Sequence, residues 1–256
     1  MDILVCIKQV PDTTEVRLRE DLTLERDFIA RVMNPADESA LEWALQTRDL
    51  IGGRVTVLSM GPPRAETTLR EALSRGADRA VLLTDPRFAG ADTLATAKCL
   101  AAAYRYLGGF DVVACGRRAV DGETGQVGPM TASILDIPCV TNITSAEADG
   151  DLTVRQLTED GVRVISCAFP ALITFCEWSL RLRLPTLMGL RSAQKAEVMT
   201  LTPDTLSLPA AECGLKGSPT RVVKVDARPV GVRPCRKMSV KEAMEALEQI
   251  CPEVLP

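Results

Sequence analysis

Histidine is absent from the 256 residues of the chain. Histidine is the base in Ser-His-Asp triads and Cys-His pairs and a ligand in most catalytic zinc sites, so its absence excludes those active sites. The nine cysteines form no Cys-x-x-Cys pair, because the closest two, Cys167 and Cys176, are nine residues apart. We interpret them as reduced, mostly buried side chains. The sequence predicts no metal site and no catalytic side chain.

Aromatic residues, long apolar runs and net positive charge are also scarce. Two Trp, two Tyr and five Phe are too few for base-stacking platforms, and a net charge of −4 gives no general attraction to nucleic acid. No run approaches the roughly 18 to 20 apolar residues of a membrane span, and MDILVCIKQV enters strand-like sequence without the apolar region of a signal peptide. We expect small-molecule and protein partners, no nucleic acid, no membrane span and a cytoplasmic location.

Short apolar runs alternate with amphipathic segments in the first half of the chain, which is typical of βαβ units. The pattern predicts an α/β fold with a doubly wound, mostly parallel sheet. Strands are expected at 3–7, 54–60, 79–85 and 111–116. Helices are expected from the Asn34-Pro35 cap, around Leu69 to Gly76, from 92 to 107 and from about Thr124.

The second half changes to β-rich runs, with charged turns between them. Two runs flank Glu159-Asp160-Gly161 and predict a hairpin that extends the sheet. A last helix begins with the capping box formed by Ser239 and Glu242. One face of this helix carries an apolar stripe formed by Val240, Ala243, Met244, Leu247 and Ile250. We expect the stripe to pack either on its own domain or on another subunit.

The segment GRRAVDGETGQVG, residues 116–128, follows the fourth expected strand and leads into a helix. Ligands of doubly wound sheets bind at the carboxyl ends of the strands, and backbone N–H groups at such a position can hold phosphate. The glycines fit neither Gly-x-Gly-x-x-Gly nor a P-loop, so the segment is either a phosphate cradle or an ordinary turn. Asp121 and Glu123 would repel phosphate and are expected to cap the helix or face ribose hydroxyls. Arg117 and Arg118 would offset their charge or remain solvated.

Asn34 has two interpretations, a hydrogen bond to a ligand or a helix cap. The carboxylates near the expected strand ends have no motif context for acid/base catalysis, so a nucleotide or cofactor holder fits better than a self-contained enzyme. A universal-stress-type ATP-binding module is the alternative. An ATP-using ligase or pyrophosphatase would need a Ser-Gly-Gly-x-Asp-Ser loop after the first strand, where this chain has Lys8 to Thr13.

Six segments occur in a characteristic order along the chain: ILVCIKQVPDT at 3–13, NPADESALEWAL at 34–45, VTVLSMGPPRAETTLREALSRGADRAVLL at 55–83, FAGADTLATA at 88–97, CGRRAVDGETGQVGP at 115–129 and VRQLTEDGVRVISCAFPALIT at 154–174. In these segments the sequence resembles the beta subunit of electron transfer flavoprotein. The resemblance covers nearly the whole chain.

The resemblance implies a Rossmann-like domain of the adenine nucleotide alpha-hydrolase type, whose site holds AMP or, in electron-bifurcating members, a second FAD. The loop from Val120 to Pro129 is similar to FAD-binding bacterial or bifurcating versions, which favours FAD. The implied cofactor-binding residues are Cys6, Asn34, Asp37, Met60, Gly116, Arg117, Arg118, Ala119, Val120, Asp121, Gly122, Glu123, Thr124, Gly125, Gln126 and Val127.

The resemblance also implies a heterodimer with an alpha subunit that holds the main flavin, and a flavin-dependent dehydrogenase partner such as an acyl-CoA dehydrogenase. The domain would span 1–190, and an arm at 191–256 would pack on the alpha subunit. Leu187 matches the apolar anchor of the family's dehydrogenase-recognition loop, although a core position is the alternative. The sequence departs from the family in two places. Near Leu187, residues 180–183 read Leu-Arg-Leu-Arg where the family has Asn-Glu-Pro-Arg, and Met188 stands where proline is usual. In the nucleotide loop, Arg118 replaces a common glutamine.

Overall fold

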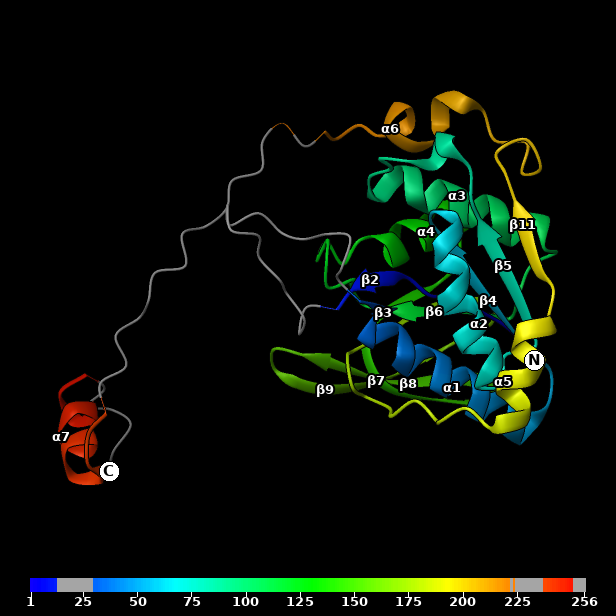
Figure 1. Ribbon diagram of the computed structural model, residues 1–256. Helices are drawn as coiled ribbons and strands as arrows, with labels where there is room; N and C mark the ends of the chain where they lie inside the picture. The colour runs from blue at the N-terminus through cyan, green and yellow to red at the C-terminus, as the bar shows by residue number, and fades with distance from the viewer. Residues whose placement is uncertain (13–29, 222, 224–236, 251–256) are drawn as a thin grey trace. The chain divides into compact units, whose positions relative to one another are not determined.

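The computed structural model describes residues 1–12, 30–221, 223 and 237–250. Within them, one sheet has the strand order β11-β5-β4-β1-β6-β10-β7-β8-β9, and β2 pairs with β3 in a separate antiparallel ribbon. Figure 1 shows β11 beside β5 at one edge of the large sheet and β9 near the other. The strands are β1 (Asp2–Cys6), β2 (Gln9–Pro11), β3 (Arg31–Met33), β4 (Arg54–Met60), β5 (Arg79–Leu83), β6 (Val112–Gly116), β7 (Cys139–Asp149), β8 (Asp151–Thr158), β9 (Gly161–Cys167), β10 (Ala171–Phe175) and β11 (Val198–Leu201).

Helices cover both faces of the sheet, so the core has two layers. One layer contains α1 and α2 side chains such as Leu41 and Leu69, and the other contains α3 and α4 side chains such as Leu100 and Ala132. The helices are α1 (Pro35–Ile51), α2 (Glu66–Ser74), α3 (Thr93–Tyr106), α4 (Val127–Leu135), α5 (Leu187–Lys195), α6 (Gly214–Gly217) and α7 (Val240–Ile250), with 3₁₀ turns η1 (Pro63–Ala65), η2 (Pro86–Phe88) and η3 (Ala210–Glu212).

β1 explains why an unbroken apolar run forms a central strand. Ile3 and Val5 point into the layer under α1, whereas Leu4 points into the opposite layer. A strand buried on both faces needs apolar residues at every position, because successive side chains point to opposite faces. The four expected strands are confirmed as the parallel set β5-β4-β1-β6.

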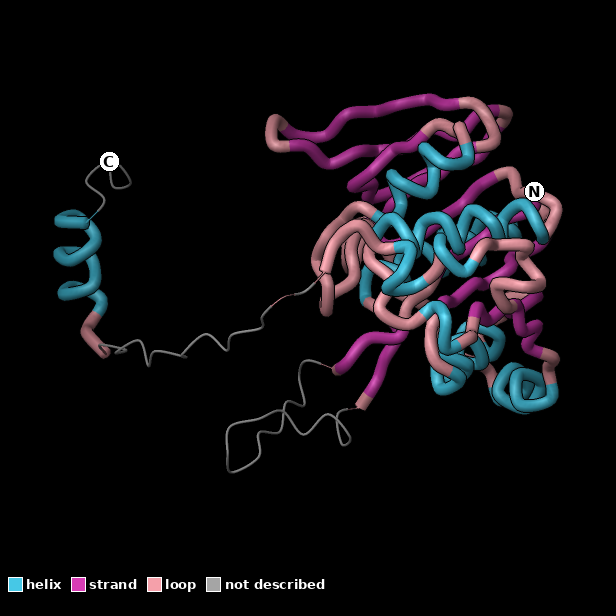
Figure 2. Tube along the Cα trace, turned by 90° about the horizontal axis from the view of Figure 1, so that it is seen from above, coloured by secondary structure: helices cyan, strands magenta, loops and turns pink. Residues whose placement is uncertain are grey.

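The β-rich second half is only partly as expected. The hairpin is confirmed, since β8 and β9 pair antiparallel with Thr158 opposite Gly161, and this ribbon is visible at the sheet edge in Figure 2. The run that follows does not continue the hairpin. β10 lies between β6 and β7 and is parallel to both. Its apolar composition predicts a buried strand, but only the tertiary pairing decides its neighbours.

The helix expected from about Thr124 begins at Val127 instead. Glu123 and Gly125 have φ values of 50° and 63°, in the left-handed region. A right-handed helix cannot include residues in that conformation, so α4 starts after them. The residues between β6 and α4, 117–126, are called the β6–α4 loop below.

The chain divides into a first unit, Met1–Arg221, and a second unit, Val222–Pro256. β11 pairs with β5 and buries Leu201, so the expected boundary at residue 190 falls inside the first unit. In the second unit the predicted capping box is present, because Ser239 N donates to the Glu242 carboxylate at 2.8 Å. Val240, Met244 and Leu247 of α7 are exposed.

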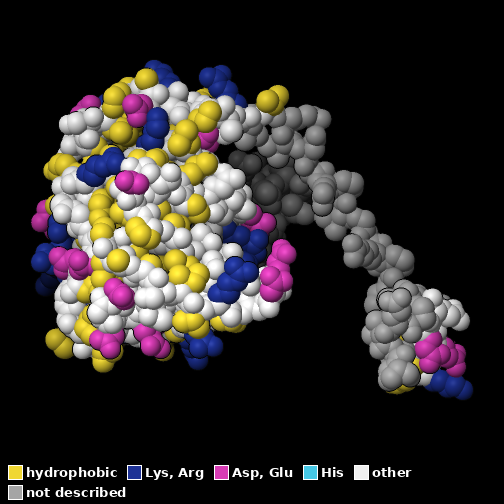
Figure 3. Space-filling view, turned by 180° about the vertical axis from the view of Figure 1, so that it is seen from behind, with side chains coloured by type: hydrophobic (Ala, Val, Ile, Leu, Met, Phe, Trp, Pro, Cys, Tyr) yellow, Lys and Arg dark blue, Asp and Glu magenta, His cyan; other side chains and the backbone are white. Residues whose placement is uncertain are grey.

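The charged surface is mixed on the face seen in Figure 3, where Lys and Arg side chains are interspersed with Asp and Glu rather than gathered in a basic stripe. None of the described helices is long and apolar enough to cross a lipid bilayer.

Candidate functional site

The candidate site lies at the carboxyl ends of β1, β4 and β6. The chain runs from β1 outward through β4 to β5 and then returns to place β6 on the other side of β1. Such a reversal of strand order leaves a crevice above the strand ends, where doubly wound sheets bind ligands. β1 ends at Cys6, β4 at Met60 and β6 at Gly116, so the fold brings three of the predicted residues to one edge.

Asp37, in the first turn of α1, joins two of these strand ends. One carboxylate oxygen accepts the main-chain N–H of Lys8 at 2.7 Å, and the other accepts that of Gly116 at 2.8 Å. A side chain on Gly116 would collide with the Asp37 carboxylate and with Ala36, which explains the glycine. Burial raises the pKa of Asp37 to about 7, although its hydrogen bonds act in the opposite direction. Asp37 therefore holds the base of the site together.

Asn34 holds the β6–α4 loop. It occupies the cap position of α1, but its side chain makes no cap hydrogen bond. Its amide donates to the carbonyl of Arg118 at 2.9 Å and accepts the N–H of Val120 at 3.1 Å. The helix-cap interpretation is therefore wrong, because the buried amide is used by a loop 84 residues further along the chain.

The β6–α4 loop presents several main-chain donors. The N–H groups of Gly122 and Glu123 both donate to the carbonyl of Ala119, at 3.3 and 2.8 Å, which closes a turn. Among the described residues, the following main-chain N–H groups, from Thr124 to Val127, have no hydrogen-bond acceptor. They lead into the amino end of α4, which carries positive partial charge. The loop is therefore suited to hold an anion such as phosphate.

The carboxylates of this loop are paired with cations. Lys8 Nζ lies 2.7 Å from an oxygen of Asp121, and Arg118 lies 3.7 Å from Glu123. Neither acid caps α4, since no side chain caps that helix at Gln126. The expectation of a helix cap is thus wrong for both residues, and their negative charge is offset locally.

Glu177, which the sequence analysis missed, pairs with both loop arginines. Its two oxygens lie 2.7 Å from Arg117 Nε and 2.9 Å from Arg118 Nε, and its side chain is only 10% exposed. The arginines are therefore not merely solvated. A signal was available in the sequence, because Glu177 closely follows the apolar strand β10, whose carboxyl end lies at the same edge of the sheet.

Apolar side chains at the ends of β1, β4 and β6 and at the start of α4 lie at the same edge of the sheet as the loop and are called the floor below. Cys6, Met60, Cys115 and Val127 are half-buried and pack against the core layer that contains Leu4. Burial, together with the nearby Asp37 carboxylate, raises the pKa of Cys6 to about 12, so its thiol stays protonated at neutral pH and is no nucleophile. The site thus combines apolar side chains with main-chain donors, and both can serve as binding groups.

A hollow of about 290 Å³ lies beside the β6–α4 loop and is lined by Arg117, Arg118, Gly125, Pro129, Thr141, Asn142 and Thr174. A larger one, of about 480 Å³, lies near the amino ends of β1 and β6 and is lined by Asp2, Tyr104 and Asp111 among others. The larger hollow contains none of the predicted site residues.

Leu187 lies away from this site, at the start of α5. Its side chain is 81% exposed, and those of Leu184 and Met188 are 78% and 79% exposed. The core interpretation of Leu187 is therefore wrong. The three side chains are called the exposed apolar loop below.

Comparison with known proteins identifies relatives along most of the chain. Residues 21–206 match a family model described as the electron transfer flavoprotein domain. The chain is 50% identical over 226 residues to the electron transfer flavoprotein subunit beta of Thermoanaerobacterium thermosaccharolyticum, covering 87% of this chain and 86% of that protein. It is 43% identical to the Protein FixA of Azorhizobium caulinodans, with 89% and 84% covered. It is 42% identical to the acryloyl-CoA reductase electron transfer subunit gamma of Anaerotignum propionicum, with 88% and 87% covered.

Proposed function

The chain belongs to the family of electron transfer flavoprotein beta subunits, and from this membership we propose that it is the small subunit of a heterodimeric electron carrier between flavin-dependent dehydrogenases. The observation that carries the proposal is the row of main-chain N–H groups at residues 124–127, at the carboxyl edge of the sheet and without acceptors among the described residues. An alpha subunit is the proposed partner in the heterodimer, and a flavin-dependent dehydrogenase such as an acyl-CoA dehydrogenase is the proposed partner in electron transfer.

The residues present fit an adenine nucleotide or FAD. The N–H groups of the β6–α4 loop would hold its phosphates, and the floor formed by Cys6 and Met60 would contact its apolar parts. Asn34 and Asp37 would act through the main chain, because they fix the loop and the strand ends to α1. A bound flavin supplies the redox chemistry, so the protein contributes binding, orientation and electrostatics.

FAD is the proposed ligand of this subunit, and electron bifurcation is the proposed activity of the heterodimer. The support is the similarity of the loop at 120–129 to FAD-binding versions in the family. AMP is the alternative, since it offers the loop a phosphate of the same chemistry. The two ligands predict different contents of the purified complex.

The test is to co-express the chain with its alpha subunit, release the ligands with acid and quantify them by chromatography. Two FAD per heterodimer are expected. A content of one FAD and one AMP per heterodimer would support the non-bifurcating alternative instead of the bifurcating one. A heterodimer that contains neither nucleotide nor flavin would contradict the proposal. A stable ATP-loaded homodimer of the isolated chain would favour the universal-stress-type alternative.

Asn34→Ala tests the role of the β6–α4 loop in this binding. The substitution removes both side-chain hydrogen bonds to the loop, so we expect the occupancy of the beta-subunit site to fall while the alpha-subunit flavin is retained. Gln46→Ala is the matched control, because it removes a side-chain amide that donates to Glu42 at 2.9 Å and makes no contact with the loop. Equal ligand occupancy in the two variants would argue against a binding role for the loop.

The exposed side chains outside the site suit two protein contacts. We propose that the exposed apolar loop docks transiently on the dehydrogenase, because electron-transfer encounters use small interfaces. We also propose that the arm at 191–256 contributes its terminal part to the alpha subunit, where the apolar stripe of α7 would be covered.

A further inference from the structure

The exposed apolar loop is fixed at both of its ends. Immediately before it, Leu182 is buried in the core layer under α1. Immediately after it, Gly189 lies so close to the main chain of Ser74 that a Cβ there would collide with the Ser74 carbonyl oxygen. Only residues 183–188 lie between these two anchors. The exposed leucines are therefore carried by a short, tethered segment.

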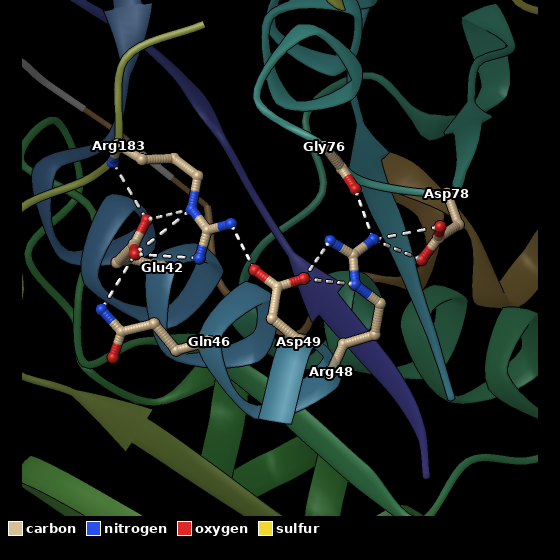
Figure 4. A network of polar contacts seen from close by, with 7 residues as sticks. All are labelled: Glu42, Gln46, Arg48, Asp49, Gly76, Asp78 and Arg183. Atoms are coloured by element: carbon tan, nitrogen blue, oxygen red, sulfur yellow. Dashed lines mark hydrogen bonds and ion pairs between the residues drawn. The ribbon is translucent and has the colours of Figure 1, made fainter. Parts of the chain in front are cut away.

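Arg183 attaches this segment to α1. Its main-chain N–H donates to a carboxylate oxygen of Glu42 at 2.9 Å, and its guanidinium donates to both oxygens at 3.1 to 3.3 Å. The Glu42 side chain is only 5% exposed, and Figure 4 shows it enclosed by Arg183 and Gln46. A carboxylate that binds both the main chain and the side chain of one residue fixes the position of that residue strongly.

The ion pair is part of a longer network, shown in Figure 4. Arg183 also donates to Asp49 at 2.6 Å, and Asp49 pairs with Arg48 at 2.7 Å. Arg48 in turn binds Asp78 and the carbonyl of Gly76, next to β5. The carbonyl of Arg183 accepts a hydrogen bond of 2.6 Å from Arg75, which follows α2. Arg183 is thus held from two elements of the rigid domain.

We infer that Arg183 is a positioning residue for partner docking: its ion pair with Glu42 holds Leu184 and Leu187 in the conformation that a flavin-dependent dehydrogenase recognises. This inference rests on the proposed function. Docking of a free segment loses affinity because its chain and side chains must be ordered on binding, and a segment that is already ordered avoids that cost. A transient interface has few contacts with which to compensate, so it depends strongly on such pre-organisation.

The test measures electron transfer from an acyl-CoA dehydrogenase, reduced by its acyl-CoA substrate, to the heterodimer. For Arg183→Ala we expect the KM for the heterodimer to rise about five- to tenfold, with kcat, flavin content and flavin potential unchanged. Arg183→Lys should lie in between, because lysine restores the charge but not the bidentate geometry. Arg87→Ala is the control, since Arg87 also pairs with two carboxylates, Asp85 and Asp204, on another part of the surface.

A double-mutant cycle separates positioning from a general structural role. If Arg183 acts through the leucines, Arg183→Ala combined with Leu184→Ala and Leu187→Ala should raise the KM no further than the two leucine substitutions alone. Additive effects, or an equal loss of kcat and flavin content, would overturn the inference. Should the heterodimer with Arg183→Ala fail to assemble, Glu42→Gln provides the same readout.

The outcomes for the leucine variant identify which proposal fails. A raised KM for the Leu184→Ala, Leu187→Ala variant together with an unchanged KM for Arg183→Ala would overturn the positioning role alone. An unchanged KM for both variants would overturn the docking role of the loop, and with it this inference, while the ligand content of the heterodimer would still support the electron carrier.

Discussion

At the scale of single residues, Asp37 shows how one buried carboxyl can organise a site without touching a ligand. Both of its oxygens are used by main-chain N–H groups, from the residues after β1 and at the end of β6. Desolvation disfavours the charged form more than these hydrogen bonds favour it, so the pKa is raised to about 7. The geometry of the strand ends is therefore linked to a proton near neutral pH.

Asp37→Asn should change the pH dependence of stability. A carboxyl with a raised pKa in the folded state binds its proton more tightly when folded, so its contribution to stability is present at low pH and is lost as pH rises through about 7. We expect the wild-type heterodimer to lose stability relative to Asp37→Asn between pH 5.5 and 8, by about 2 kcal/mol, because only about 1.5 pH units of that interval lie below the folded-state pKa of about 7.

Asp204→Asn is the control for this experiment, because Arg87 lowers the pKa of Asp204 below its usual range. That carboxyl stays ionised across the whole interval, so its removal should leave the pH profile unchanged. Parallel profiles for wild type and Asp37→Asn would contradict the raised pKa.

At the scale of elements, the position of α5 is set by a close approach to α2. Gly189 lies against the carbonyl of Ser74, and Arg70 of α2 donates to the carbonyl of Ala196 at 3.2 Å, at the end of α5. Thr186 caps the start of α5 by accepting the N–H of Gly189 at 2.9 Å. The helix that carries Leu187 is thus held at its first turn and at its end.

Gly189→Val should displace α5 from α2. The new side chain meets a main-chain oxygen that has no freedom to rotate away, so we expect a loss of about 1–3 kcal/mol in the free energy of unfolding. Ala210→Val is the control, because Ala210 is exposed and lies outside both the β6–α4 loop and the contact between α5 and α2. Unfolding midpoints of the two heterodimers give the comparison, and equal midpoints would contradict the close packing.

At the scale of the whole molecule, the first unit contains both core layers, and the second unit contains α7 with the exposed side chains of Val240, Met244 and Leu247. Residues 191–221, expected to belong to the arm, contribute β11 to the sheet. The fold of the first unit therefore needs the chain as far as about Arg221.

Truncation after Arg221 should leave the first unit folded but weaken its association with the alpha subunit. Truncation after Leu190 is the matched comparison, and we expect it to lose thermal stability, because it removes β11 and exposes the edge of β5. Circular dichroism measures folding, and co-purification measures association. Full association after removal of 222–256 would contradict the proposed role of the arm.

The sequence by itself determined the four central strands, the helices between them, the β8–β9 hairpin and the place of the β6–α4 loop. These features depend on local signals: continuous apolar runs for strands buried on both faces, helical spacing, turn residues and caps. Those signals did not predict the left-handed conformation of Glu123 and Gly125, because of which α4 begins only at Val127.

Only the tertiary structure decided the pairs that shape the site and the exposed apolar loop. Glu177 meets Arg118 across 59 residues, and Arg183 meets Glu42 across 141 residues. The insertion of β10 between β6 and β7 is of the same kind. Such contacts have no local periodicity, because they arise only when strand order brings distant segments to one edge of the sheet and burial then requires each charge to find a partner.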